Sequence, residues 1–557
     1  MLNLLQDKWI PVRNKLEEEM LIAPWEVTDT SLVHVSGVRP DFQGTYALFL
    51  IGLFQTIMPP DNEYAWRTLF RRPPSEEELK KKFEEYKSYF DVFSGDKRFL
   101  QDPLVQDNKP ERIGRLLLEA PSQNVDETDS GEGSQRENFF QQSTISRLCP
   151  SCASAALLTL QIQAPSGGGR GYLSGLRGHG PLTTIIIGRT LWETIWLNVL
   201  SFEDFSKLGN CEWNNSHEKI FPWLEKGSEG PAKKITPQDA SPYQMFWAMP
   251  RRVFLNIVDE EGICDLCGVV SSPVIDSFTT KNGGISYIGG WRHSLSPHII
   301  FEKDGTSKAL SVERDGVSYK NWIGVVQVFS DGKKQDLPAA VVSKFTSSSS
   351  LRSKMLDLKS GQRTPIWAFG YYMIQMKKQP RCYHASMIPV SEVPAELRED
   401  LDILISQWIL CSSHLLYTLS QCIKQAWYAS PKNHKGDVPG LSTRFWKETE
   451  EYFYESMNEV VKTGNVDDKT LINCSWLKKI SDACFRLFDE YVAYDQKASD
   501  QADPSDPKRL VHARKLLKIW THASNKKIGD ILNLPKPTTR KREDGTEYMA
   551  ICPEALR

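Results

Sequence analysis

Hydrophobic residues change their spacing once along the chain, close to residue 390. From Pro394 onward they recur every three or four positions, which is the period of an amphipathic helix. Four such stripes follow one another: Leu401, Leu404, Trp408, Cys411, Leu415, Leu419, Cys422 and Ala426; Trp446, Thr449, Phe453, Met457 and Val460; Trp476, Ile480, Cys484, Leu487 and Tyr491; and Leu510, Ala513, Leu517 and Trp520. The sequence therefore predicts a C-terminal four-helix bundle over residues 391–557.

Before residue 390 the hydrophobic runs are short and of mixed period. We expect a strand over Lys8–Val12 that proline ends, a buried helix over Thr45–Met58, a solvated helix over Glu76–Tyr89, a strand leading into a helix over Leu182–Leu200, a strand over Val253–Val258, β-like runs that include Trp322–Phe329, and a hairpin over Tyr371–His384. The predicted fold class is α+β, with a large mixed α/β N-terminal domain over residues 1–390 followed by the bundle.

The composition is that of an ordinary soluble globular protein, since 40% of the 557 residues are hydrophobic and 25% are charged. The formal net charge is -2, whereas a free-standing nucleic-acid binder usually carries a basic excess. Any contact with nucleic acid is therefore expected to be local or shared with partner proteins. The opening residues MLNLLQDKWIPV are too short and polar for a secretion signal, and Tyr46–Met58 is too short to span a bilayer.

These features predict a cytoplasmic protein without a membrane partner. The eleven cysteines, an odd number in a chain without a secretion signal, argue against a disulfide framework. Two pairs stand out as CxxC motifs, namely Cys149 with Cys152 and Cys264 with Cys267. Two such turns can close a tetrahedral Cys₄ site, so we expect a structural zinc ion.

Metal-free thiols and redox chemistry are the alternatives for these cysteines. Four protein ligands leave no position for a reactive water, so the expected zinc is not catalytic. The sequence also lacks the HExxH, GxSxG and Walker patterns, and no cluster of His and Asp typical of a nuclease stands out.

A glycine-rich stretch, residues 164–180 (APSGGGRGYLSGLRGHG), lies between the two CxxC pairs. Glycine lets a ligand approach the main chain closely, and Arg170 and Arg177 lie within the stretch, so it suits a phosphate backbone or the narrow groove of a duplex. A flexible linker or a cluster of turns is the alternative interpretation.

A polar, acidic segment over residues 121–137 predicts a mobile loop, and Asn138-Phe139-Phe140-Gln141 follows it. Either the two phenylalanines anchor that loop in the core, or they form an exposed group with the amides that stacks on bases.

The ordered set of motifs resembles a known family. NLLQDKWIPV near the start, RFLQDPLV, Phe139 before a CxxC, the GGG and SGLRG run, a second CxxC followed by a lysine and WRHSLSP, and a C-terminal helical bundle occur in this order. Together they resemble the large subunit of the type I-E CRISPR Cascade complex, the CasA family, over nearly the whole chain.

The resemblance implies a non-catalytic subunit of an RNA-guided surveillance complex. Such subunits recognise the protospacer-adjacent motif (PAM) in target double-stranded DNA, help to open the duplex into an R-loop, and help to recruit a helicase-nuclease. The implied partners are the other Cascade subunits, the crRNA, the target DNA and that helicase-nuclease. In the implied mechanism, base pairing with the guide RNA recognises the target DNA sequence, and the protein recognises only the short PAM. Another RNA-guided effector divides recognition in the same way.

The resemblance also implies roles for particular residues. Gly167, Gly168 and Gly169 would lay backbone along the minor groove, and Lys281 would reach base edges there, with Asn282 as the alternative. Gln379 at the hairpin tip would be the wedge that starts strand separation, with Gln375 as the alternative.

Phe139 and Gln141 match the base-contacting loop of the family, which also resembles a loop that meets the 5′ end of the guide RNA. Two other functions stay open at this stage. A zinc-containing nucleic-acid-processing enzyme would use the glycine run as a substrate cradle, and a purely structural assembly protein would not depend on the DNA motif.

Overall fold

The computed structural model describes residues 2–118, 144–166, 171–208, 216–225, 232–347, 352–357, 363–374, 379–434, 436–464, 466, 468–493, 506–536, 538–541 and 547–550. Backbone contacts divide the chain into two compact units. The first consists of Met1–Val317, Gly324–Asp357 and Thr364–Val390. The second consists of Ser318–Ile323, Leu358–Arg363 and Ser391–Arg557.

The first unit opens with a small antiparallel sheet in the order β2-β1-β3. Its strands are β1 (Ile10–Asn14), β2 (Glu19–Ile22) and β3 (Leu32–Val35). The predicted strand is present, but it continues past Pro11 instead of ending there. Proline locks only its own φ and lacks an N–H, and a strand tolerates both where no ladder hydrogen bond is needed.

Helix α1 (Pro40–Ile57) is the central helix of the first unit and confirms the predicted buried helix. It begins with proline at its first position, where the missing N–H costs nothing. Helix α4 (Pro150–Gln163) packs against it, with the Thr45 and Thr159 hydroxyls 2.7 Å apart. The other α-helices of this unit are α2 (Glu63–Arg71), α3 (Glu76–Glu84), α5 (Leu191–Leu197), α6 (Phe202–Phe205), α7 (His217–Ile220) and α9 (Ala340–Thr346).

An aromatic cluster fills much of the core beside α1. The rings of Trp9, Phe49, Phe90, Phe99 and Trp247 meet mostly edge to face, with centroids 5.0–6.4 Å apart. All five side chains are almost fully buried. Such pairs add to the free energy gained from burial alone, so this cluster gives the first unit a rigid centre.

The remaining strands of the first unit form several small sheets rather than one large one. One sheet has the order β4-β10-β7, with β4 (Glu111–Arg112), β7 (Arg252–Val258) and β10 (Val274–Lys281). A second has the order β17-β16-β5, with β5 (Thr183–Ile186), β16 (Arg363–Ile374) and β17 (Gln379–Ser391). A third has the order β13-β12-β15-β14, with β12 (His298–Phe301), β13 (Ser307–Ala309), β14 (Phe329–Ser330) and β15 (Lys334–Leu337).

Two further strand pairs are β6 (Lys233–Ile235) with β11 (Ile285–Tyr287), and β8 (Gly262–Ile263) with β9 (Val270–Ser271). The predicted strand around Val253 and the hairpin over Tyr371–His384 are therefore confirmed. The β-like prediction for Trp322–Phe329 was wrong at its start, because α8 (Trp322–Val325) is a single helical turn, which is too short to show a helical period.

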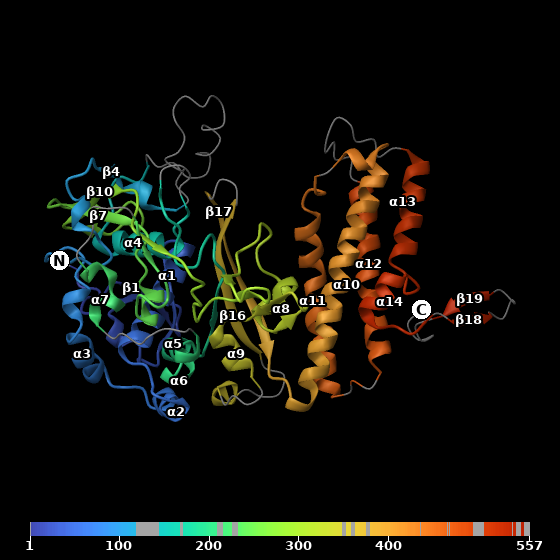
Figure 1. The fold of residues 1–557 in the computed structure, drawn as a ribbon, viewed down its shortest axis with the longest axis horizontal. Helices are drawn as coiled ribbons and strands as arrows, with labels where there is room; N and C mark the ends of the chain where they lie inside the picture. The colour runs from blue at the N-terminus through green and yellow to red at the C-terminus, as the bar shows by residue number, and fades with distance from the viewer. Residues whose placement is uncertain are drawn as a thin grey trace. The chain divides into compact units, whose positions relative to one another are not determined.

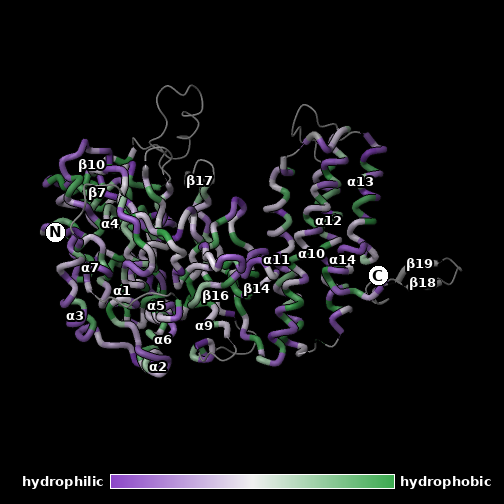
Figure 2. Tube along the Cα trace, viewed as in Figure 1, coloured by the Kyte–Doolittle hydropathy of each residue, from purple (hydrophilic) through white to green (hydrophobic). Residues whose placement is uncertain are grey.

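In the second unit, α10 (Ala395–Trp427), α11 (Leu441–Thr463), α12 (Lys469–Ala493) and α13 (Pro507–Trp520) confirm the four predicted helices. They run side by side, with α10 packed against each of the other three (Figure 1). Hydrophobic residues recur along each helix in Figure 2, and the predicted apolar stripes are buried almost throughout. A short helix that the sequence did not predict, α14 (Lys526–Leu532), also packs on α10. Strands β18 (Thr538–Lys541) and β19 (Glu547–Ala550) form a separate hairpin.

The centre of the bundle is built around a residue from outside the four helices. Tyr319 stacks on Phe453 at 4.7 Å, meets Trp446 edge to face, and lies 2.8 Å from the Thr449 hydroxyl. Its side chain is fully buried. The segment Ser318–Ile323 therefore supplies core to the second unit, although its position before residue 390 predicts that it belongs to the N-terminal domain.

Helix α10 is long and apolar enough to cross a membrane by length and composition alone. Half of the qualifying stretch is buried inside the protein, as is typical of the core helix of a bundle. In the same unit Cys474 of α12 is disulfide-bonded, which the sequence analysis did not predict.

Candidate metal centre and nucleic-acid interface

The four cysteines of the two CxxC motifs come together in the first unit. The Sγ atoms of Cys149, Cys152, Cys264 and Cys267 all lie within 4.8 Å of one another, and those of Cys149 and Cys267 are 3.7 Å apart. A tetrahedral zinc ion with Zn–S bonds of about 2.3 Å needs its sulfurs about 3.8 Å apart. The prediction that these four thiols converge is confirmed, and their spacing fits a tetrahedral metal ion.

Local backbone geometry aims each pair of thiols. Cys149 is the N-cap of α4, and its sulfur accepts a hydrogen bond from the Cys152 N–H at 3.4 Å. The second pair lies in the turn between β8 and β9, where the Cys264 N–H donates to the Val269 carbonyl at 2.9 Å. Gly268 takes a φ of +73° there, which only glycine adopts without strain, and its N–H donates to the Cys264 carbonyl.

Protein hydrogen bonds also join the two CxxC segments directly. One carboxylate oxygen of Asp265 accepts hydrogen bonds from the backbone N–H groups of Ser146 and Arg147, at 2.7 and 2.8 Å. The Asp265 N–H donates in turn to the Arg147 carbonyl at 2.9 Å. Leu148 and Ile275 exchange two further backbone bonds. The two CxxC motifs are more than one hundred residues apart in the sequence. They are held together both by the converging thiols and by these hydrogen bonds, which we call the Asp265 clamp.

The thiols perturb one another strongly because they are crowded and partly buried. Hydrogen bonds from Cys149 and Cys152 hold the pKa of Cys264 far below its usual range. Hydrogen bonding to Cys149 raises the pKa of Cys152, and burial adds to that rise. Bringing all four to the thiolate form therefore needs a cation, because four adjacent negative charges repel one another.

The end of the glycine run lies against the loop that follows β10. The Gly283 N–H donates to the Gly171 carbonyl at 3.1 Å, and Tyr172 forms an isolated parallel bridge with Gly283. A Cβ placed on Gly171 would lie 3.7 Å from the Asn282 side-chain nitrogen. Lys281, the last residue of β10, and Asn282 are both exposed at this junction.

Further polar groups surround Lys281. The side-chain N–H of Asn108 donates to the Thr280 carbonyl at 3.0 Å, which brings the exposed Lys109 near the same strand end. Arg252 pairs across the sheet with Lys281, but its side chain is buried and bonded to Asp102 at 2.6 Å. Lys109 and Lys281 are thus available to a ligand, whereas Arg252 is neutralised. Sequence reasoning missed Asn108 and Lys109 because no local pattern links them to a strand 172 residues away.

The second half of the glycine run has a packing role that the sequence did not reveal. A Cβ on Gly175 would lie 2.7 Å from the Ile162 carbonyl, and one on Gly180 would lie 2.3 Å from the Tyr371 carbonyl. Arg177 is buried and donates to the hydroxyls of Thr183 and Ser296, at 2.7 and 2.9 Å. The interpretation of Arg177 as a phosphate contact was therefore wrong, since its guanidinium is buried and hydrogen-bonds to the hydroxyls of the protein itself.

The β16–β17 hairpin is anchored at its base. The Tyr371 hydroxyl donates to the Asp41 carboxylate at 2.7 Å, and Arg39 pairs with the same carboxylate at 2.9 Å, all three groups being buried. The backbone of Gln379 begins β17, as expected for a residue at the tip side of the hairpin.

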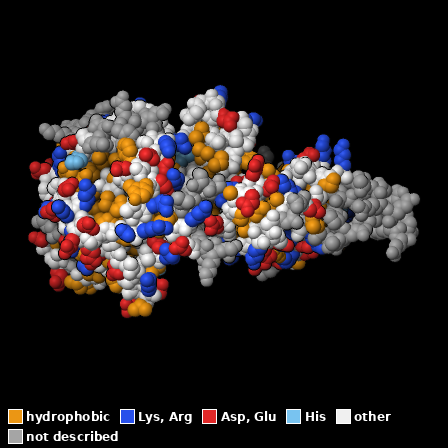
Figure 3. Space-filling model, turned by 90° about the horizontal axis from the view of Figure 1, so that it is seen from below, with side chains coloured by type: hydrophobic (Ala, Val, Ile, Leu, Met, Phe, Trp, Pro, Cys, Tyr) orange, Lys and Arg blue, Asp and Glu red, His pale blue; other side chains and the backbone are white. Residues whose placement is uncertain are grey.

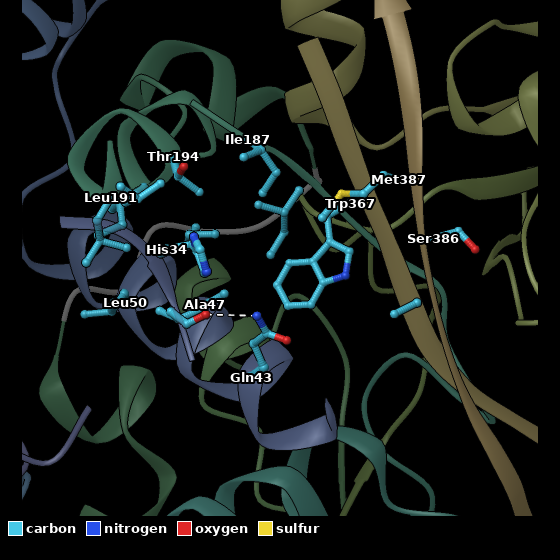
Figure 4. A pocket seen from close by; sticks show the side chains of 16 residues that line it. His34, Gln43, Ala47, Leu50, Ile187, Leu191, Thr194, Trp367, Ser386 and Met387 are labelled. Atoms are coloured by element: carbon cyan, nitrogen blue, oxygen red, sulfur yellow. Dashed lines mark hydrogen bonds between the residues drawn. The ribbon is translucent and has the colours of Figure 1, made fainter. Parts of the chain in front are cut away.

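Beside the hairpin lies a cavity of about 400 Å³, between the hairpin, β3, α1 and α5. Trp367 and Met387 reach it from the hairpin, and Leu191 and His34 from the other side, while the Gln43 amide bonds to the Val35 carbonyl at its floor (Figure 4). The hairpin base is therefore held by the buried Asp41 network, and packing along this flank is incomplete.

Several predicted site residues lie outside the described residues, namely Phe139, Gln141, Gly167, Gly168, Gly169 and Gln375, and so does the acidic segment 121–137. The structure does bring the described parts of the glycine run and of the Lys281 loop together. On the face drawn in Figure 3, Lys and Arg side chains are interspersed with Asp and Glu, as the net charge of -2 leads one to expect.

A family profile and several solved structures resemble this chain, and they agree on the family. The profile of the family described as CRISPR-associated protein Cse1 matches residues 3–487. The fold matches the structure of Thermus thermophilus CasA (Cse1) with a TM-score of 0.64 at 13% identity, over 93% of this chain and 99% of that chain. It matches Thermobifida fusca Cse1 with a TM-score of 0.65 at 13% identity, over 96% and 98%. A chain of a CRISPR RNA-guided surveillance complex matches with a TM-score of 0.66 at 16% identity, over 93% and 99%.

Proposed function

The chain belongs to the CRISPR-associated Cse1 family, and from this premise we propose that it is the large, non-catalytic subunit of a type I-E RNA-guided surveillance complex. In this role it recognises the PAM of target double-stranded DNA from the minor groove, promotes duplex opening and helps to recruit the helicase-nuclease. Its partners are the other Cascade subunits, the crRNA and the target DNA, in the cytoplasm. The matched surveillance-complex chain supports this assignment.

The observation that carries the DNA-reading role is the junction of Gly171 with the loop after β10. The Gly283–Gly171 hydrogen bond brings a side-chain-free backbone next to an exposed cation, Lys281, and an exposed amide, Asn282. The minor groove offers mainly acceptors on its floor, so a lysine or an amide suits it. Contacts in the minor groove distinguish A·T from G·C pairs but little else, so we expect the protein to accept several related motifs.

In this proposal the Cys₄ centre holds zinc in a structural role. Four thiolates complete a tetrahedral shell, so the ion would supply mechanical closure and no open coordination position. The centre ties the start of α4, which leads into the glycine run, to the β8–β9 hairpin, which precedes β10 and Lys281. The metal centre would thus fix the spacing of the two halves of the DNA-reading junction.

The test is to reconstitute the complex with and without this chain and to compare binding to duplexes that differ only in the flanking motif. Lys281→Ala should weaken binding of motif-bearing duplexes about tenfold, the usual scale for a charge-assisted contact, without impairing assembly. Lys303→Ala removes an exposed lysine of the same unit elsewhere and is the matched control. Equal loss in both variants, or none in either, would contradict the role of Lys281.

Gln379 is proposed as the wedge at the hairpin tip. Gln379→Ala should slow opening of a closed duplex more than it weakens binding to a pre-opened one, because unstacking a step costs a few kcal/mol. Equal effects on both substrates would remove this assignment. Metal-dependent cleavage of nucleic acid by the purified chain alone would instead favour a zinc-containing processing enzyme.

A further inference from the structure

A second cavity of the first unit, about 540 Å³ in volume, lies between α6, the loop 289–292 and the β12–β13 turn. We propose that this cavity binds a phosphate-bearing ligand of nucleotide size. The cavity is separate from the junction of Gly171 with Lys281, and none of those residues lines it. The inference does not depend on the proposed function, because the isolated chain suffices to test it.

Arg292 supplies the charge for such a ligand. Its side chain lines the cavity and is half-buried. Burial lowers the pKa of Arg292, but the ordinary value for arginine is so high that the guanidinium stays charged at neutral pH. Among the residues that the structure describes, no carboxylate pairs with it. A partly desolvated guanidinium without a counter-ion is costly, and a bidentate phosphate is the ligand that it matches best.

Two neutral donors on the same wall also lack partners. The indole N–H of Trp291 is buried without a hydrogen-bond partner, and Trp291 as a whole is only 6% exposed. The Ser307 hydroxyl, on the segment that packs against Gly290, is buried and unpartnered as well. Buried polar groups are nearly always satisfied, so these two unsatisfied donors mark a wall with unused hydrogen-bonding capacity, which a ligand would reach after a small movement of that wall.

The backbone between these donors is open to close approach. Gly289 and Gly290 have φ values of +84° and +74°, and their N–H groups make no backbone hydrogen bond within the described chain. Without side chains they let a ligand approach the main chain closely beside Arg292. Backbone N–H groups of this kind, next to a guanidinium, are a common phosphate-binding arrangement.

The other charged groups of the wall are already engaged. Asp304 accepts hydrogen bonds from the N–H and the hydroxyl of Thr306 within its own turn. Lys207 bonds to Asp204 at 3.1 Å. Hydrogen bonds to Thr306 leave Asp304 negatively charged, so an anion in this cavity is bound only where Arg292 lies closer to it than Asp304 does.

The rest of the wall is apolar and suits the remainder of a nucleotide. Pro237, Pro242, Met245 and Ile300 line this side. A pocket that combines an apolar face with a few convergent polar groups is typical of small-ligand sites of this volume. A base or sugar on the apolar side with its phosphate at Arg292 would use both halves of the cavity.

The phosphate can come from a free nucleotide or from a nucleic-acid strand, and the experiment separates the two. Binding of AMP and of the oligonucleotide dT10 to the full chain is measured by titration calorimetry at low salt. The wild-type chain should bind at least one of them, and Arg292→Gln should weaken that binding about tenfold or more. Arg314→Gln, which changes an exposed arginine of the same unit, is the matched control and should bind normally.

AMP binding that depends on Arg292 identifies a free-nucleotide site, and dT10 binding alone identifies a strand phosphate; both support the proposal. Ser307→Ala removes one unpartnered hydroxyl without changing charge and should weaken binding by a smaller factor, with an unchanged unfolding temperature. If the wild-type chain binds neither probe, or if Arg292→Gln and Arg314→Gln bind equally, the inference is wrong.

Discussion

Gly178 and Gly180 offer a controlled test of why the end of the glycine run is glycine. Both have positive φ, +86° and +54°, so an alanine at either position costs about 1–2 kcal/mol of backbone strain. Their surroundings differ: nothing lies within 4 Å of a Cβ on Gly178, whereas one on Gly180 would lie 2.3 Å from the Tyr371 carbonyl.

The crowding at Gly180 sets the expected difference. A Cβ there would be about 1 Å too close to backbone that the sheet holds in place, and overpacking of this kind costs about 1–3 kcal/mol. Gly178→Ala should therefore lose about 1–2 kcal/mol of unfolding free energy and Gly180→Ala about 2–5 kcal/mol. Urea unfolding of the purified chain, followed by tryptophan fluorescence, measures both.

Two results would refute this reasoning. Equal destabilisation by the two substitutions would show that the close approach to Tyr371 is not limiting. A Gly180→Ala chain that keeps its stability while its reconstituted complex loses DNA binding would show that this end of the run faces a ligand rather than β16.

Three further outcomes are expected. Asp265→Asn should speed loss of zinc to a chelator about 10–100-fold, with Asp276→Asn, an exposed carboxylate on β10, as the control; equal rates would contradict the clamp. Burial lowers the pKa of His298 to about 4, below its value of 6.5 in the unfolded chain. As the pH falls, the unfolded chain is therefore protonated first. The free energy of unfolding should decrease by roughly 3 kcal/mol between pH 6.5 and pH 4. A His298→Gln chain with the same acid profile in unfolding experiments would argue against this. Tyr319→Phe should cost about 1 kcal/mol in thermal unfolding because the hydrogen bond to Thr449 is lost, although Thr449 keeps its bond to the Phe445 carbonyl; Tyr417→Phe, at an exposed site, should cost nothing measurable.

The sequence predicted well what depends on local periodicity and on ligand chemistry. Each bundle helix carries an apolar stripe longer than three turns, and α10 to α13 appear where those stripes lie. The CxxC pairs were recognisable because the thiol spacing is itself the requirement for sharing one metal ion. Helix α14, with only seven residues, is too short to show a period and was missed.

What the sequence could not supply depends on contacts between distant segments. Tyr319 looks like any half-polar loop residue until the bundle closes on it, and Arg177 looks like a phosphate ligand until Thr183 and Ser296 are seen to hold it. The one feature of the sequence that points to Asp265 is its position between the two cysteines of the second CxxC motif. The sequence alone does not show whether a glycine leaves space for a ligand or for a carbonyl of the protein itself. Gly180 is of the second kind, because it lies against the Tyr371 carbonyl.

The buried link from Tyr371 through Asp41 to Arg39 has a mechanical consequence. It joins the long strand β16 to the first turn of α1, and further along this helix Phe49 and Phe54 pack among other aromatic rings. We therefore expect a force along β16 to be transmitted to α1 through these buried contacts, whereas the cavity beside Trp367 and Met387 leaves the flank of the hairpin less constrained.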